Sequence, residues 1–212
     1  MSQDLIEQYQ QLHRNETFGI SGNLFRPHIQ ALIHELRPRT IVNFGCGSTK
    51  LHEELQLQDA VFHRYDPAIA ELSVLPVTSA DLVINTDVLE HIPRSELDSV
   101  LAQIRALSAK VFFNIATRPA RQLLPDGSNA HCTILPAAEW QSILARHFPQ
   151  TELVWDIPGW ACSFVTWPSS SLEILRELER SATLRRFHKK RALRLFTRFK
   201  GRQWKGWTEL MR

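Results

Sequence analysis

Two short stretches of the sequence contain residues whose types and spacing are typical of a nucleotide-binding site. The stretch NFGCGS places Gly45 and Gly47 two positions apart, directly after an apolar run. Glycines at such a turn permit positive φ angles and let a ligand approach the backbone. Asp66 ends the next apolar stretch, where a carboxylate can accept hydrogen bonds from both hydroxyls of a ribose. The pattern indicates a nucleotide-like ligand, with a simple tight turn as the alternative.

Two common nucleotide-binding patterns do not match this sequence. A dinucleotide-binding turn needs a third glycine where the helix meets the sheet, and counting from Gly45 places Lys50 there. This argues against a nicotinamide dinucleotide. The sequence also contains no GxxxxGK[ST] stretch, which excludes a P-loop.

Two histidines follow apolar runs and could act as a general base. His91 lies in DVLEHIP and His131 lies in LPDGSNAHCT, and both should fall in loops at the carboxyl ends of strands, where α/β folds bind ligands. Histidine is the usual base for a hydroxyl acceptor. We predict catalytic roles for both, with a helix-capping or packing role as the alternative for His91.

Three further polar residues are candidates for substrate binding. Arg118 follows the run KVFFNIAT and could meet either an anionic acceptor or an acidic residue of the same body. Asp126 and Asn129 share the loop of His131 and could bind substrate or form Asx turns. No clustered carboxylates accompany Asn114, so we expect no metal site.

The elements that must position these residues alternate between strand and helix patterns. Apolar runs predict strands at residues 40–44, 61–66, 80–86, 110–117, 152–157 and 161–167, and helical spacing predicts helices at 3–14, 26–36, 51–57, 95–107 and 136–148. Alternation favours an α/β fold with a Rossmann-like, doubly wound, mostly parallel sheet. The short turn before residue 161 predicts an antiparallel terminal strand, and Ser95 with Asp98 predicts a capped helix start.

One connection is too short for the usual doubly wound pattern. Residues 67–79 separate Asp66 from the next strand, whereas a parallel crossover alone needs a dozen or more residues. The region of the third strand is therefore expected to be shortened.

The successive stretches FGCGS, YDP, ADLVINTDVLEHIP and KVFFNIATRP resemble the motifs of class I S-adenosylmethionine-dependent methyltransferases over residues 38–167. The resemblance implies that S-adenosylmethionine is the cofactor and that Asp66 holds its ribose hydroxyls. It implies cofactor contacts from these residues: Asn43, Gly45, Cys46, Gly47, Asp66, Pro67, Thr86, Asp87 and Val88.

The sequence departs from the family pattern at two positions in the glycine turn. Asn43 stands where the family usually has an acid, and its amide oxygen can accept from the cofactor ammonium without charge assistance. Thr49 replaces the family's third glycine. These departures keep open a methyltransferase fold that serves as a non-catalytic scaffold.

The stretches LPDGSNAH and DVLEHIP also resemble, more loosely, bacterial methyltransferases of surface-polysaccharide and O-antigen synthesis. That resemblance implies O-methylation of a glycan or lipid-linked glycan, at a sugar hydroxyl or a glycan phosphate. RNA methylation is the alternative enzyme class.

Charge divides the chain into a body and a tail. Residues 181–212 contain eleven lysines and arginines and one acid, so the formal charge of +3 divides into +10 for this tail and −7 for residues 1–180. From Leu184 onward, aromatic and leucine residues alternate with basic ones at helical spacing. This pattern is typical of a helix at an anionic membrane surface; binding to nucleic acid and packing on a protein body are alternatives.

We therefore expect a helical N-terminal segment or lid over residues 1–37, a methyltransferase domain over 38–168 and a basic amphipathic tail over 169–212. No apolar run reaches the roughly 18 residues of a membrane-spanning helix. Three scattered cysteines and a polar N-terminus favour a reducing, cytoplasmic location. The basic tail would allow peripheral attachment at the inner face of the cytoplasmic membrane.

Overall fold

A computed structural model of the chain describes residues 2–15 and 21–184. The chain divides into two compact units, Met1–Leu175 and Arg176–Arg212. All the elements named below belong to the first unit. Residues 172–184 are helical, and the predicted amphipathic helix beyond them lies outside the described residues.

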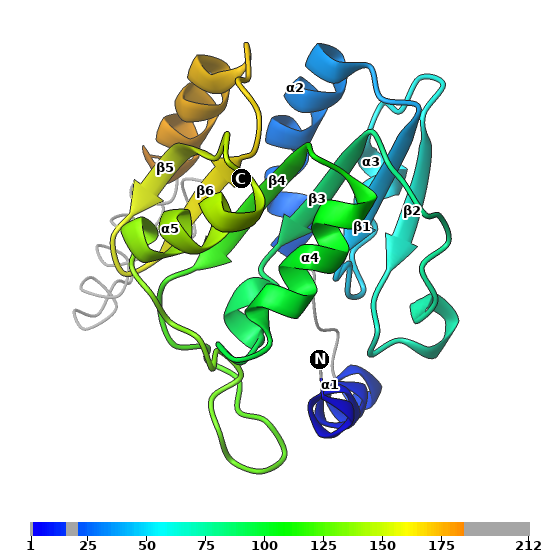
Figure 1. Cartoon of the computed structure of the whole chain (residues 1–212), viewed down its shortest axis with the longest axis vertical. Helices are drawn as coiled ribbons and strands as arrows, with labels where there is room; N and C mark the ends of the chain where they lie inside the picture. The colour runs from blue at the N-terminus through cyan, green and yellow to red at the C-terminus, as the bar shows by residue number, and fades with distance from the viewer. Residues whose placement is uncertain (1, 16–20, 185–212) are drawn as a thin grey trace, which may run out of the picture. The chain divides into compact units, whose positions relative to one another are not determined.

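A single six-stranded sheet forms the centre of the first unit (Figure 1). Its strands are β1 (Thr40–Phe44), β2 (Val61–Tyr65), β3 (Leu82–Thr86), β4 (Val111–Ala116), β5 (Glu152–Ile157) and β6 (Ala161–Val165). They lie in the order β2-β1-β3-β4-β6-β5. The first four are parallel, and β6 runs antiparallel to both β4 and β5. The predicted mostly parallel sheet with an antiparallel terminal strand is confirmed.

The predicted shortening after the second strand is also confirmed. The chain between β2 and β3 contains only a short 3-10 turn, η2 (Ala70–Leu72), among its described elements. As a result β2 is one of the two edge strands of the sheet, and β5 is the other.

Helices cover both faces of the sheet (Figure 1). One face packs on α4 (Leu97–Leu107) and α5 (Ala137–His147), whose apolar residues join those of β1, β3 and β4 in one core. The other face packs on α2 (Arg26–Leu36) and the short α3 (Leu51–Glu54), which form a second core with β1, β3 and β6. The Rossmann-like layers follow from strands that are apolar on both faces.

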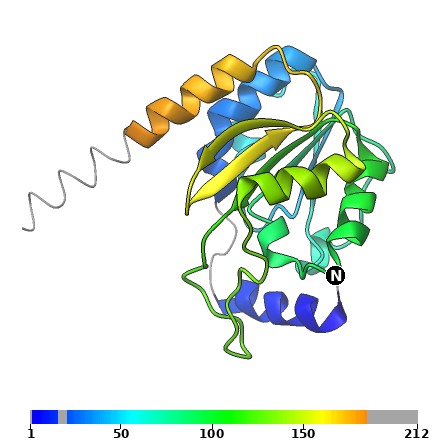
Figure 2. The ribbon, with the colours of Figure 1, turned by 60° about the vertical axis from the view of Figure 1, so that its left-hand side comes forward.

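The N-terminal helix α1 (Gln3–Asn15) lies beyond the carboxyl ends of the parallel strands, beside the long loop that follows β4 (Figures 1 and 2). Its buried residues Leu5, Tyr9 and Leu12 form a third, small core with residues that include Leu124 and Ala130 of that loop. A 3-10 turn, η1 (Ser21–Phe25), leads into α2. The amphipathic spacing of α1 thus places its apolar stripe against the end of the sheet where ligands bind in this class of fold.

Two local predictions are wrong. The helix predicted to start at Ser95 begins at Leu97, and its N-cap, Glu96, makes no side-chain cap hydrogen bond. Asp98 instead accepts from His147 at 3.0 Å, because tertiary packing of α4 against α5 offers it a partner. The helix predicted over residues 51–57 ends at Glu54, and Leu55 is extended.

Candidate functional site

The turn after β1 requires a glycine at its first position. Gly45 has φ of 75° and Gly47 has φ of 52°, a region that side chains disfavour. A Cβ added to Gly45 would lie 2.5 Å from a methyl carbon of Val88. The N–H groups of Gly45 and Cys46 both donate to the carbonyl of Tyr65, at 2.8 and 3.0 Å. The turn therefore sits tightly between the ends of β2 and β3.

Asp66 connects this turn to the end of β2. Its Oδ2 accepts from the Gly47 N–H at 2.8 Å and its Oδ1 accepts from the Ala68 N–H at 2.9 Å. The side chain is mostly buried yet lines the cavity described below. Each carboxylate oxygen can accept more than one hydrogen bond, so Asp66 can hold the loop and still accept from a ligand hydroxyl.

The backbone after β3 is held in an unusual conformation. Asp87 has φ of 55°, which costs about 1–2 kcal/mol for a residue with a side chain. Its N–H donates to the carbonyl of Asn114 at 2.8 Å, and the Asn114 amide donates to the Asp87 carboxylate at 2.5 Å. Ser163 in turn donates to Asn114 at 2.6 Å. Strain maintained by neighbouring strands is typical of functional sites.

These elements open on one cavity at the carboxyl ends of the parallel strands. Its lining comprises Tyr9, His13, Gly22, Gly45, Cys46, Gly47, Asp66, Pro67, Ala68, Thr86, Asp87, Val88, His91 and Ile92. Eight of the nine residues predicted to contact the cofactor are in this set; Asn43, buried in β1, is not. The cavity is what the glycine turn and Asp66 predicted, because parallel strands bring their carboxyl ends together.

Cys46 lines the cavity, but its thiol is not a candidate nucleophile. Burial, followed by the negative charge of Asp66, raises its pKa to about 11, so it carries a proton at neutral pH. A protonated, buried thiol is a poor nucleophile.

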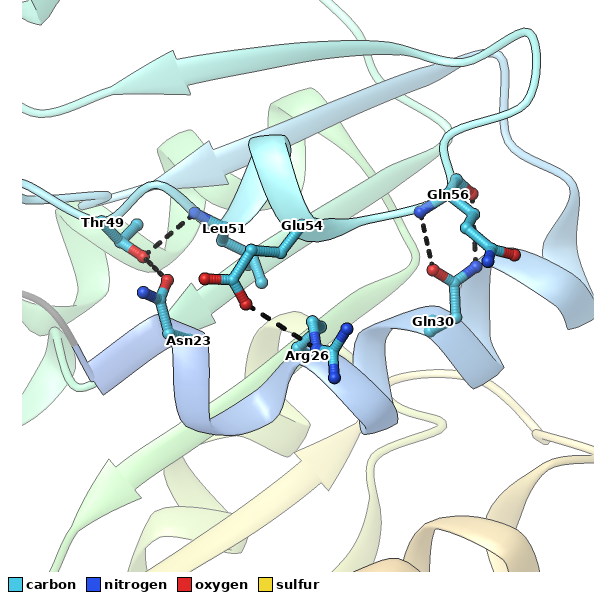
Figure 3. Close-up of polar contacts among 7 residues, drawn as sticks. All are labelled: Asn23, Arg26, Gln30, Thr49, Leu51, Glu54 and Gln56. Carbon is cyan, nitrogen blue, oxygen red and sulfur yellow. Dashed lines mark hydrogen bonds and ion pairs between the residues drawn. The ribbon is translucent and has the colours of Figure 1, made fainter.

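Thr49, at the position of the family's third glycine, ties the N-terminal segment to the glycine turn (Figure 3). Its hydroxyl donates to Asn23 at 2.5 Å and accepts from the Leu51 N–H at 3.3 Å. Farther along, Gln30 exchanges two hydrogen bonds with the backbone of Gln56. Thr49 therefore makes two side-chain hydrogen bonds that a glycine at this position could not make.

The two predicted catalytic histidines lie side by side. Their rings are edge to face, with centroids 4.7 Å apart. His91 Nδ1 lies 2.9 Å from the carbonyl of Ala130 and 2.8 Å from the hydroxyl of Tyr9. His131 Nδ1 lies 2.6 Å from the carbonyl of Arg118. Because a carbonyl only accepts, each Nδ1 carries the proton and each Nε2 carries the lone pair.

Both imidazoles are neutral at pH 7. Burial, followed by the neighbouring His131, lowers the pKa of His91 to about 4. Burial also lowers the pKa of His131. His91 lines the cavity, whereas His131, from the loop after β4, contacts the ring of His91 and is not among the lining residues. The arrangement can accept a proton or coordinate a cation.

The three predicted substrate-binding residues do not line the cavity. The guanidinium of Arg118 lies 3.9 Å from the ring centroid of Trp160. Asp126, on the exposed loop, accepts from the N–H and hydroxyl of Ser128 as in an Asx turn. Asn129 bonds the backbone of Ala120 and of His131, which orders the loop that carries the histidine. Substrate binding by these residues stays a prediction.

Several site residues lacked a sequence signal. Tyr9 and His13 come from α1, where only the fold reveals that the helix reaches the cavity. Glu90 is fully buried beside the histidines. It stands in the DVLEHIP motif, where an acid directly after the apolar Leu89 is the signal that could have identified it.

No protein-family model and no curated protein matches the chain. Among solved structures, the chain is similar to 1,6-didemethyltoxoflavin-N1-methyltransferase of Burkholderia thailandensis, solved with 1,6-didemethyltoxoflavin and S-adenosylhomocysteine. The TM-score is 0.51 at 13% identity, over 78% of this chain and 86% of that chain. DhpI in complex with SAH is similar with a TM-score of 0.50 at 15% identity, over 79% of this chain and 100% of that chain. The chain thus has the fold of class I methyltransferases, as its sequence predicted.

Proposed function

We propose that this chain is an S-adenosylmethionine-dependent methyltransferase that methylates oxygen on a glycan. The observation that carries the proposal is the meeting of Gly45, Asp66 and Asp87 around one cavity. The fold supports it, and both solved structures named above hold the demethylated form of that cofactor.

The residues of the cavity fit such a cofactor. Gly45, Cys46 and Gly47 all line the cavity, so that a ligand in it can lie against the backbone of the turn. Asp66 retains acceptor capacity for two vicinal hydroxyls. When bound, S-adenosylmethionine supplies a methyl group on a sulfonium, which needs alignment more than chemical activation.

The histidines support transfer to a hydroxyl. Each Nε2 carries a lone pair that can accept the proton of an acceptor hydroxyl. His91 lies at the cavity wall and His131 stands next to it. A sugar hydroxyl or a glycan phosphate is the proposed acceptor, on the strength of the loop LPDGSNAH and the motif DVLEHIP.

We further propose that the basic tail brings the enzyme to a membrane-bound acceptor. The tail carries +10 over residues 181–212, and each basic residue near an anionic surface contributes about 1 kcal/mol. No helix among the described residues is long and apolar enough to cross a bilayer. On the strength of the charge of the tail, we propose peripheral attachment at the cytoplasmic membrane face.

Calorimetry with S-adenosylhomocysteine tests the cofactor site. Asp66→Ala should weaken binding at least tenfold, because hydrogen bonds to a charged acceptor contribute about 1.5–3 kcal/mol each. Asp59→Asn, at an exposed position before β2, is the matched control and should bind as the wild type does.

Absence of binding by the folded wild-type chain would reject the enzyme and favour a scaffold. The acceptor is tested by methylation assays on lipid-linked saccharides and on RNA. Transfer to RNA alone would replace the glycan proposal.

A further inference from the structure

Glu90 is a buried carboxyl that the proposed cofactor site does not use. Its side chain is fully buried, and Oε1 accepts from the Ala116 N–H at 2.9 Å. Oε2 is also buried and has no hydrogen-bond partner among the described residues. Burial, followed by the charge of Asp87, holds the pKa of Glu90 well above its usual range. Burial of a carboxyl oxygen without a hydrogen-bond partner costs free energy. We therefore expect a ligand that bonds this oxygen and offsets the cost.

The two neighbouring histidines are oriented as metal ligands usually are. A ligating histidine donates its second ring N–H to a carbonyl or carboxylate, which fixes the tautomer. Here the carbonyls of Ala130 and Arg118 accept from Nδ1 of His91 and His131 respectively. Tyr9 donates to the same Ala130 carbonyl at 2.8 Å, so α1 helps to fix the ring of His91.

The three side chains converge. One carboxylate oxygen of Glu90 and one ring nitrogen of each histidine all lie within 4.8 Å of one another. Donor atoms bound to one Zn²⁺ at about 2.1 Å lie roughly 3.4 Å apart. Small side-chain rotations would therefore bring the three atoms around one ion.

We infer that Glu90, His91 and His131 form a binding site for a first-row divalent transition-metal ion at the wall of the cavity. Two imidazoles and one carboxylate suit Zn²⁺, Co²⁺ or Fe²⁺ better than Ca²⁺ or Mg²⁺, which prefer oxygen ligands. Asp87, whose charge acts on both Glu90 and His131, opposes the positive charge of Arg118. Binding of a cation requires that Glu90 lose its proton, and the negative charges of Glu90 and Asp87 then exceed the positive charge of Arg118.

The sequence predicts no metal site, so the inferred site differs from that prediction. A role of the bound ion in catalysis rests on the proposed function. A cation bound there can coordinate an acceptor hydroxyl and lower its pKa. The hydroxyl proton then leaves to water, and the histidines act as ligands in place of a base. The competing account is a protonated Glu90 that donates a hydrogen bond to a neighbouring group and binds no ion.

Metal binding is tested directly on the chelator-treated full chain, without cofactor or acceptor. Titration with Co²⁺, followed by visible ligand-field absorption, and with Zn²⁺, followed by calorimetry, should give one ion per chain. Glu90→Gln keeps the acceptor for the Ala116 N–H and should weaken Zn²⁺ binding about 100-fold, as should His131→Gln. His147→Gln, which removes a histidine that contacts exposed Asp98, should bind as the wild type does.

Failure of the wild-type chain to bind either ion would overturn the site, as would equal binding by all four proteins. Thermal unfolding with and without Zn²⁺ provides a second readout, because an ion that binds the folded chain raises Tm in the wild type. S-adenosylhomocysteine calorimetry on the same samples separates the two proposals. Metal binding without cofactor binding rejects the proposed function alone, and cofactor binding without metal binding rejects the site alone.

Discussion

Gly45, in the lining of the cavity, illustrates how two constraints select one residue type. Its positive φ and the proximity of Val88 are separate constraints. The first concerns the local backbone, and the second concerns packing between the ends of β1 and β3. Only glycine satisfies both.

Gly45→Ala should lower the free energy of unfolding by about 2–4 kcal/mol, the sum of backbone strain and overpacking. Gly159→Ala is the matched control, since Gly159 has φ of 67° and nothing within 4 Å of an added Cβ. It should cost only about 1–2 kcal/mol. Urea unfolding measures both variants, and equal losses would show that Val88 imposes no constraint.

Residue-level prediction from the sequence succeeded where the signal is local. Gly45, Gly47 and Asp66 follow apolar strands at a recognisable spacing, and all three line the cavity. Tyr9 could not be predicted, because it reaches His91 across 82 positions of the chain. The family resemblance implies a cofactor contact from Asn43, yet Asn43 is not among the residues that line the cavity.

At the scale of elements, Glu35 joins α2 to the segment after β6. Its carboxylate accepts from the Trp167 indole at 3.0 Å and from the Ser169 hydroxyl at 2.7 Å. It also accepts from the N–H groups of Ser170 and Ser171. Burial opposes ionisation, but hydrogen bonds from Ser169, Trp167 and Ser171 outweigh it and lower the pKa of Glu35.

Glu35→Gln should therefore reduce stability near neutral pH and flatten its acid dependence. The wild type gains stability from ionised Glu35 at pH values above the ordinary glutamate pKa, and loses it as pH falls through the lowered folded pKa. Urea unfolding between pH 3 and 7 measures the difference. Glu53→Gln, at an exposed position, is the control, and matching pH curves for the two variants would contradict this role.

Element order was predictable because period-2 and helical patterns are local, and the short segment 67–79 revealed the missing strand. The residues at which helices begin were less predictable. Ser95 and Asp98 matched a capping pattern, but His147 of α5 competes for Asp98. The position of α1 over the strand ends depends on contacts with the loop after β4, which spacing does not encode.

At the scale of the whole molecule, charge separates an acidic body from a basic tail. Removal of residues 185–212 should abolish flotation with vesicles that contain anionic lipid, while S-adenosylhomocysteine affinity should stay unchanged. Neutral vesicles are the control, and flotation should weaken as salt rises. Equal flotation of the full and truncated chains would remove the proposed membrane role of the tail.

The central claim is that Asp66 and the turn at Gly45 hold an adenosyl cofactor. A crystal structure of the chain with S-adenosylhomocysteine tests it most directly. We predict both ribose hydroxyls within hydrogen-bond distance of the Asp66 carboxylate, with the ligand lying against the backbone of residues 45–47. A ligand bound elsewhere, or a cavity that stays closed at saturating concentration, would contradict the account.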